Sequence, residues 1–386
     1  MAKTVPSILR PGATFAILGE APSVDDEDKG VPFVGAAGGL LNHILKSVGI
    51  DRNDCSLLNV FCTRPPKNDV SYFFQGKLAA RGLNTPYPPY NGKYLKPAWW
   101  QEIERVRREL ADCNPRIVFA LGGAALWSLT HLSRINDHRG TLLNPHQRLG
   151  GSNLPGSISE NPTGPRTTDM GLLPWDDVGG NIQSATSPTY QIIPTFSPRA
   201  ILADYALLPV VTADFDRGNR VASGHFKEIK KHIVIPESRA DLEQVFDKLE
   251  QFTLLAVDVE TEEKQITCIS IAPASDLSYS IPIWSKLEPG WCAWSLDTEV
   301  LLWYRLKLLL EGPRRLIFHN GMYDLTYLHS CGIVPRLTPH DTMMIQHSAQ
   351  PEMRKSLGFM ASLYTDNPSW KWRNPKRIKD IDKTDE

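Results

Sequence analysis

Short apolar segments alternate with helical patterns along residues 12–131, and this alternation restricts the fold more than any other feature of the chain. Three of these apolar segments have the length and composition of buried strands: residues 14–19 (TFAILG), 56–61 (SLLNVF) and 116–121 (RIVFAL). The segments between them carry apolar residues at helical spacing. Strands separated by helices are typical of parallel β–α–β units, which bind ligands at the carboxyl ends of the strands. We therefore predict an α/β fold for this region.

Composition excludes several classes of protein. The 386 residues contain 42 Lys and Arg against 43 Asp and Glu, so a chain-wide basic field is absent and a polyanion must bind a local patch. The six Cys include no CxxC pair, which argues against a disulfide scaffold and against a clustered-thiolate zinc or iron–sulfur site. No apolar run approaches the roughly 18–20 residues of a membrane span, and no secretory signal opens the chain. We expect a cytoplasmic protein without a membrane partner.

A second pattern begins near residue 231. Strand-like segments at 232–235 and 254–259 enclose a helical segment, and two alternating segments that follow suggest antiparallel neighbours. The predicted organisation is a first domain over residues 1–215 with insertions at about 68–94 and 136–187, a linker at 216–231, a second domain over 232–370 and a polar tail at 371–386. Both domains are predicted to be α/β.

Two acids end the apolar strand of the second domain, in the run LLAVDVETE. Asp258 and Glu260 are two residues apart, so on a strand their side chains point to the same face. Carboxylates this close repel each other unless one is protonated or a cation lies between them, and hard divalent ions such as Mg²⁺ or Mn²⁺ prefer oxygen ligands. Taken alone, the pair is more typical of a solvated strand end.

A third acid strengthens the metal hypothesis. Asn320 and Asp324 open a helix after another apolar strand, and their spacing of four residues places both on one side of it. Asp324 is then in a position to reach a cation near Asp258. Asp341 begins a further helical segment, where the first-turn or N-cap role of an acid is favoured over metal binding.

The second domain resembles a nuclease family. Its DVE motif followed by NGMYD, with the later run LGFMASLYTD, is similar to the DEDD-type 3′–5′ exonucleases, and most of all to the proofreading domain of phage-type family-A DNA polymerases. The resemblance implies a ribonuclease-H-like fold and two-metal hydrolysis at the 3′ end of single-stranded DNA. Asp258 would bridge both metals, Glu260 would bind the water-activating one and Asp324 the other. Asn320 and Tyr323 would contact DNA.

The chain departs from this family at the third motif. The family places Tyr-x-x-x-Asp after the SLYTD region, whereas here Tyr364 is followed by Asp366 and the tail contains no Tyr. We expect either an impaired exonuclease with weaker metal binding, or a site completed by a separate polymerase-domain chain.

Polar residues follow the strands of the first domain at the edge where a ligand is expected. Glu20 follows the first strand, Phe33 lies in the next loop, Asn59 and Arg64 follow the second strand, and Ser197 follows the last one. Each alone is typical of turn chemistry. Their combination indicates a binding crevice.

The first domain, over residues 12–215, resembles the uracil-DNA glycosylase superfamily in its family-4-like branch through GEAP, PFVG, GGLL and RPP. The resemblance implies an αβα sandwich in which Glu20 lies in the catalytic turn, Phe33 stacks on a flipped base, Asn59 reads its Watson–Crick edge and Arg64 contacts phosphate. The chain departs from this branch at two positions. Ser197 replaces a His that would stabilise a departing uracil anion, and Cys62 lies one place early for the family's cluster, so we expect no iron–sulfur cluster.

Together the two resemblances predict the N-terminal part of a phage-type family-A DNA polymerase, carrying a proofreading exonuclease and a uracil-recognition module. Its expected partners are DNA 3′ ends, including uracil-containing ones, and a polymerase-domain chain in the host cytoplasm. Two alternatives stay open at this point. One is an active uracil-DNA glycosylase, and the other is a non-catalytic DNA-binding adaptor of the replisome.

Overall fold

The computed structural model describes residues 3–145, 190–227, 229–284 and 292–366. Most of the predicted insertion at 136–187 and the whole predicted tail at 371–386 lie outside the described residues. Contacts divide the chain into two compact units, which are treated separately below. The first unit comprises residues 1–35, 53–133 and 142–192, and the second comprises 36–52, 134–141 and 193–386.

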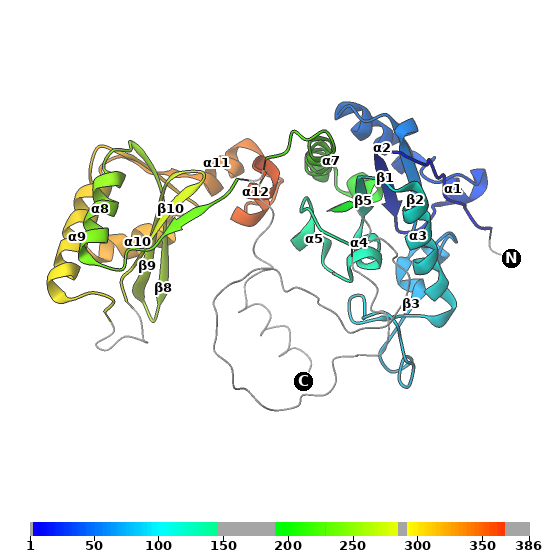
Figure 1. Cartoon of the computed structure of the whole chain (residues 1–386), viewed down its shortest axis with the longest axis horizontal. Coiled ribbons are helices and arrows are strands. Elements are labelled where there is room, and N and C mark those ends of the chain that lie inside the picture. The colour runs from blue at the N-terminus through cyan, green and yellow to red at the C-terminus, as the bar shows by residue number, and fades with distance from the viewer. Residues whose placement is uncertain (1–2, 146–189, 228, 285–291, 367–386) are drawn as a thin grey trace, which may run out of the picture. The chain divides into compact units, whose positions relative to one another are not determined.

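The first part of the chain forms a four-stranded sheet with the order β2-β1-β5-β6 (Figure 1). The strands are β1 (Phe15–Gly19), β2 (Cys55–Asn59), β5 (Ile117–Leu121) and β6 (Gln191–Thr195). β1 is parallel to both β2 and β5, and all residues of these three strands are buried. A parallel strand that is covered on both faces needs a continuous apolar run, and such runs predicted these strands from the sequence. The predicted α/β class is confirmed.

Helices lie between these strands and after the last of them. They are α1 (Val24–Lys29), α2 (Ala36–Ser47), α3 (Trp100–Cys113), α4 (Gly123–Thr130), α5 (Ile135–His138), α6 (Pro198–Ala203) and α7 (Leu208–Ala222). By contacts, α2, α5, α6 and α7 belong to the second unit. Because α7 runs to Ala222, the first part of the segment predicted as a linker, residues 216–231, is helical. The predicted domain limits stay a prediction.

The predicted insertion at 68–94 contributes to the core of the first unit. It contains β3 (Phe74–Gln75), which pairs with β4 (Tyr94–Leu95) in a small antiparallel ladder. Phe73 is fully buried and stacks on Phe61 with ring centroids 3.8 Å apart. This segment is therefore packed into the unit through aromatic side chains.

The second unit contains a six-stranded sheet with the order β12-β11-β8-β9-β10-β7. Its strands are β7 (His232–Val234), β8 (Leu254–Glu262), β9 (Gln265–Ala274), β10 (Leu277–Pro282), β11 (Arg315–Phe318) and β12 (His340–Asp341). β8, β9 and β10 run antiparallel in sequence, and β11 lies parallel to β8 on its other side and to β12. This is the arrangement of the ribonuclease-H-like fold, so the predicted fold class is confirmed here as well.

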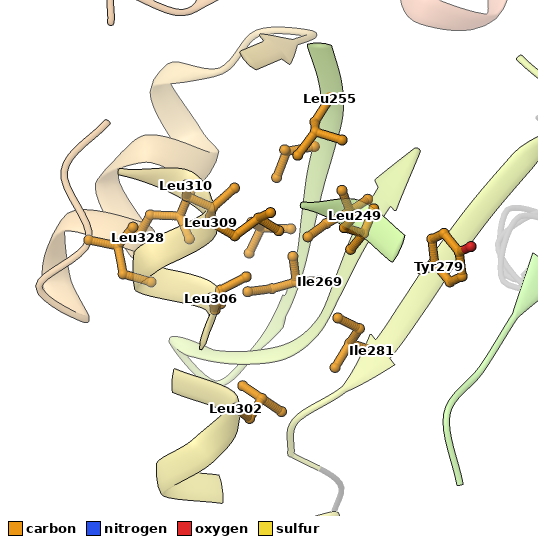
Figure 2. Packing of buried hydrophobic residues seen from close by; sticks show 14 of the residues in the cluster. Leu249, Leu255, Ile269, Tyr279, Ile281, Leu302, Leu306, Leu309, Leu310 and Leu328 are labelled. Atoms are coloured by element: carbon orange, nitrogen blue, oxygen red, sulfur yellow. The ribbon is translucent and has the colours of Figure 1, made fainter. Parts of the chain in front are cut away.

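Leucine-rich helices cover one face of this sheet. The helices of this region are α8 (Arg239–Leu249), α9 (Leu296–Leu310), α10 (Met322–Ser330), α11 (Thr342–Ala349) and α12 (Leu357–Tyr364). Leu302, Leu306 and Leu309 of α9 belong to the same buried apolar cluster as Ile269 of β9 (Figure 2). Their spacing of three to four residues gives α9 one continuous apolar face. Burying that face fixes β8, the strand that carries the predicted acids.

A buried ion pair links α5, α7 and α12 within the second unit. Arg139 and Asp214 are 1% and 0% exposed and lie 2.7 Å apart. Arg139 also donates to Ser362 Oγ at 2.8 Å, and Arg217 donates to the Ser362 and Thr365 carbonyls. The Arg217 guanidinium thus satisfies carbonyls at the end of α12 that the helix itself leaves unpaired, while Arg139 binds the Ser362 hydroxyl.

Within the described residues, no helix has both the length and the apolar character needed to cross a membrane.

Candidate active sites

The end of β1 is a point of very close packing. Gly19 lies opposite Asn59 in the β1–β2 register. A Cβ atom on Gly19 would collide with Asn59 Oδ1 and would lie 2.8 Å from Cζ of Phe33. Asn59 is 3% exposed and Phe33 is half-buried. The structure therefore brings the predicted base-stacking and base-reading side chains together against the same stretch of backbone.

The loop that presents Phe33 is held by a buried carboxylate. Asp26 accepts hydrogen bonds from the backbone N–H of Ser23 at 2.9 Å and of Val34 at 2.8 Å. Phe33 itself has a φ of +59°, which is uncommon for a bulky residue and costs energy unless the surroundings enforce it. Because the Asp26 carboxylate binds the backbone on both sides of the loop, it restricts the position of the Phe33 ring.

Glu20 is held against the start of α4. Its Oε1 accepts a hydrogen bond of 2.8 Å from the backbone N–H of Ala124. A Cβ atom on Gly122, where φ is +99°, would lie 2.6 Å from Glu20 Cδ, so this glycine is needed for both conformation and space. A carboxylate at a helix N-terminus is stabilised by the unpaired N–H groups and the helix dipole. The contact favours an ionised Glu20.

The sequence did not indicate a role for Tyr90. The structure places its hydroxyl at the start of α4, near Glu20. A Cβ atom on Gly123 would collide with the Tyr90 hydroxyl. Burial, and to a smaller extent the charge of Glu20, raises the pKa of Tyr90 to about 12. The available signal was the aromatic run PYPPY in the insertion, but it does not show which tyrosine returns to the sheet edge.

Three other residues singled out in the first domain have local roles. Arg64 forms an ion pair of 2.5 Å with Glu27. Ser197 is the N-cap of α6 and accepts from the Ala200 backbone N–H, so the residue at the family's His position acts here as a helix cap. Burial raises the pKa of Cys62 to about 11, which keeps its thiol protonated at neutral pH.

In the second unit, three acids meet beside β8. Side chains of this strand alternate, so that Val257 and Val259 are buried while Asp258 and Glu260 are exposed. Asp324, on α10, is only 4% exposed, and its Oδ1 accepts a 2.8 Å hydrogen bond from the Val259 backbone N–H. Burial, together with the charges of Asp258 and Glu260, raises the pKa of Asp324. The predicted trio is thus brought together in a like-charged cluster.

Asp341 organises the loop in front of α10. Its carboxylate accepts from the backbone N–H groups of Asn320 at 3.1 Å, Gly321 at 2.8 Å and Met343 at 2.8 Å. Although burial acts in the opposite direction, these hydrogen bonds lower the pKa of Asp341. Asp341 is the N-cap of α11, as favoured from the sequence. It also supports Asn320, whose φ is +61°.

The Tyr323 hydroxyl forms a short hydrogen bond with the Thr261 hydroxyl on β8. This contact joins the first turn of α10 to the strand that carries Asp258 and Glu260. Tyr323 is nevertheless 49% exposed, so its ring stays accessible from solvent. In this structure the residue ties α10 to β8, and its predicted contact with DNA stays a prediction.

The acids beside β8 fit a hard divalent cation in their chemistry. All three donors are carboxylates. Burial raises the pKa of Asp324 most, and the charges of Asp258 and Glu260, which a cation would neutralise, raise it further. Among the residues that the structure describes, no group of three or more His, Cys, Asp or Glu side chains is already at metal-binding spacing. The exposed side chains of Asp258 and Glu260 would therefore turn toward an ion as it binds.

A family model described as the uracil DNA glycosylase superfamily matches residues 6–214. Type-4 uracil-DNA glycosylase of Archaeoglobus fulgidus is 47% identical over 64 residues, which are 17% of this chain and 32% of that protein. The Thermotoga maritima enzyme is 45% identical over 115 residues, 29% of this chain and 46% of that protein. The chain thus spans about a third to a half of the length of these curated relatives.

Solved structures of low similarity were also found. The catalytic core of RRP6 from Trypanosoma brucei matches with a TM-score of 0.30 and 16% identity, covering 39% of each chain. Escherichia coli RNase D matches with a TM-score of 0.27 and 17% identity, covering 35% of this chain and 34% of that chain. Brucella melitensis NrnC with bound Mg²⁺ matches with a TM-score of 0.25 and 19% identity, covering 36% and 62%. The strand order, and not these scores, identifies the fold of the second unit.

Proposed function

The chain belongs to the uracil DNA glycosylase superfamily, and from this premise we propose that its first unit binds a uracil base that has left the DNA helix. The packing of Phe33 and Asn59 around Gly19 carries this proposal. An aromatic ring supplies a stacking surface, and a side-chain amide supplies both a donor and an acceptor, as the imide edge of uracil requires. The rigid loop around Asp26 avoids the entropy cost of ordering this site on binding.

Uracil excision is a further activity of the same site, favoured by the contact between Glu20 and the start of α4. In the proposed step, water adds to C1′ of the deoxyribose, its proton passes to the Glu20 carboxylate, and the C1′–N1 bond breaks with its electron pair on the base. Ser197 caps α6 and supplies no cation to the departing base. We therefore expect excision to be slow relative to binding.

Oligonucleotides containing one uracil test both statements. Wild-type protein should bind them more tightly than thymine controls and leave abasic sites in the presence of EDTA. Asn59→Asp should lose the preference because a carboxylate lacks the amide donor, and Glu20→Gln should lose excision while keeping binding. Asn84→Asp, which adds the same charge at an exposed position of the same unit, is the matched control. Equal binding of uracil and thymine by wild-type protein would refute uracil recognition.

A second candidate function, 3′–5′ exonuclease activity, is favoured by the acids that meet beside β8. When bound, two divalent metal ions would activate a water and stabilise the leaving 3′ oxygen. Asp258 and Glu260 would face such ions from the exposed side of the strand, and Asp324 would be held in place by the Val259 backbone. Tyr323 and Asn320 lie next to this cluster and are proposed to contact the DNA end.

A 3′-labelled single strand tests the nuclease directly. We expect shortening from the 3′ end with Mg²⁺ or Mn²⁺, and loss of it with EDTA. Asp258→Asn should be inactive, whereas Asp276→Asn, the same charge change in the exposed turn between β9 and β10, should match wild type. Since base excision needs no metal, EDTA separates the two activities. An intact protein that shortens no DNA with either metal, both alone and with a polymerase-domain chain added, contradicts the nuclease proposal.

We further propose that both sites serve phage-type DNA replication, with a family-A polymerase-domain chain as the partner. This rests on the resemblance of the second unit to proofreading domains. Addition of such a polymerase chain should increase removal of a mismatched 3′ nucleotide relative to the sum of the separate proteins. DNA binding with neither activity would instead indicate a non-catalytic adaptor.

A further inference from the structure

The segment between β2 and α3 brings a hydroxyl group back to the Glu20 end of the first unit. Gly122 and Gly123 are consecutive, and an added Cβ would meet Glu20 on the first and the Tyr90 hydroxyl on the second. The carboxylate and the phenol therefore approach the same short stretch of backbone at the start of α4. No function has been given to this tyrosine in the site described above.

Tyr90 is fixed in place from both its backbone and its ring. Its N–H donates to the Lys93 carbonyl at 2.8 Å, and the Lys93 N–H donates back at 3.0 Å. The ring lies 5.1 Å from that of Phe74 and 6.0 Å from that of Trp127, both of them buried. Since aromatic contacts of this kind restrict ring motion, the hydroxyl keeps one position relative to α4.

The hydroxyl is a neutral donor under ordinary conditions. Burial and the charge of Glu20 keep the phenol protonated far above neutral pH. The Asn91 side chain acts in the opposite direction and lowers this pKa. A protonated phenol can donate a hydrogen bond, and the Glu20 carboxylate, which approaches the adjacent Gly122, is the natural acceptor. Such a donor holds an ionised carboxylate without adding charge to the site.

We propose that Tyr90 is a positioning residue for Glu20, holding the carboxylate against the start of α4 so that it can accept a proton from the attacking water. This role rests on the proposed excision activity. The phenol keeps its own proton throughout, and the proton from water is taken up by Glu20. The aromatic segment 68–94 is then part of the glycosylase-like site and not only a surface insertion.

Tyrosine labelled with ¹³C at Cζ gives a test that does not depend on catalysis. The Tyr90 signal is identified as the one lost in Tyr90→Phe. In wild type it should titrate near pH 12, and in Glu20→Gln it should move toward the ordinary value of about 10. Tyr87 of the same segment donates to Glu104 at 3.0 Å, so its signal should not shift and serves as the control. An unchanged Tyr90 titration in Glu20→Gln overturns the proposal.

Excision kinetics give the second measurement. Tyr90→Phe keeps the ring and should lower kcat by up to about a hundredfold with little change in KM, because the loss is one of positioning. Gly123→Ala should produce the same defect by displacing the hydroxyl, and Tyr87→Phe should not. Full activity of Tyr90→Phe overturns the proposal. If wild type excises no uracil, the proposed excision fails, and the titration still decides whether Tyr90 and Glu20 are coupled.

Discussion

One candidate site lies at the carboxyl end of β1 and the other lies beside the middle of β8, and the two are built in opposite ways. At the end of β1, an amide and an aromatic ring are packed so tightly that Gly19 has no room for a methyl group. Beside β8, two exposed carboxylates and one buried carboxylate share negative charge. The first arrangement suits a flat, uncharged ligand without rearrangement, whereas the second is relieved only by a cation or a proton. Close packing defines one site and unbalanced charge defines the other.

The largest effect is expected at the charged site. Asp324→Asn removes one of the three carboxylates while keeping an oxygen that can accept from the Val259 N–H. Nuclease activity should fall at least about a hundredfold, since losing a ligand should cost no less than losing one of the outer partners of a metal site. Initial rates on 3′-labelled DNA across a Mg²⁺ series measure this, with Asp276→Asn as the control. Wild-type rates would show that Asp324 takes no part in the nuclease.

The packed site should respond to a single methyl group. Gly19→Ala displaces Asn59 and Phe33 from their places against the backbone of β1. It should lower the free energy of unfolding by about 1–3 kcal/mol, the usual cost of overpacking, and abolish the preference for uracil. Gly39→Ala on α2 is the matched control, because its added Cβ meets nothing within 4 Å. It should be stabilising by roughly 0.5–1 kcal/mol. Denaturant unfolding followed by oligonucleotide binding measures both.

How far the sequence predicts these sites depends on how local their determinants are. Asp258 and Glu260 were recognisable because two residues on one strand always share a face. The α/β folds followed from apolar runs and helical spacing. Tyr90, near the end of the insertion at 68–94, could not be placed because its position depends on ring contacts with Phe74 and with Trp127 of α4. Hydrogen bonds between distant segments, such as Asp324 to Val259, leave no periodic pattern in the chain.

The charged site should also give stability an unusual dependence on pH. Because the pKa of Asp324 is raised on folding, the folded state binds this proton more tightly than the unfolded chain does. The stabilising contribution of this proton is complete below the pKa of Asp in the unfolded chain, about 3.9. It is lost as the pH rises through the higher pKa that Asp324 has in the folded state. Relative to Asp324→Asn, wild type should therefore lose stability as the pH rises toward neutral.

Urea unfolding of both proteins over a pH series measures this difference, and Mg²⁺ should restore part of the loss in wild type only. If wild type without metal becomes more stable relative to Asp324→Asn as the pH rises to neutral, repulsion among the three acids is contradicted. A metal effect of equal size in both proteins would place the ion elsewhere.

A smaller effect tests whether Ser197 is only structural. Ser197→Ala removes the N-cap of α6 and should cost about 1 kcal/mol of unfolding free energy, while uracil binding stays at the wild-type level. Asp204→Ala, which removes the side chain that accepts from the Ala206 N–H in the next turn of chain, is a comparable cap deletion. Loss of uracil affinity in the serine variant alone would give Ser197 a role in the first site.

The smallest effect concerns Arg64, whose guanidinium is 2.5 Å from Glu27 with both side chains partly exposed. Such a pair contributes only about 0.2–1 kcal/mol to stability, so Arg64→Gln should fold normally. If Arg64 contacts a DNA phosphate, Arg64→Gln should weaken the binding of uracil-containing and thymine-containing strands alike. It should also reduce by about one the slope of the logarithm of the binding constant against the logarithm of the salt concentration. Glu27→Gln breaks the same ion pair but keeps the cation, so it should preserve the slope. An equal loss of slope in both variants would mean that the ion pair, and not the arginine, shapes the surface that DNA meets.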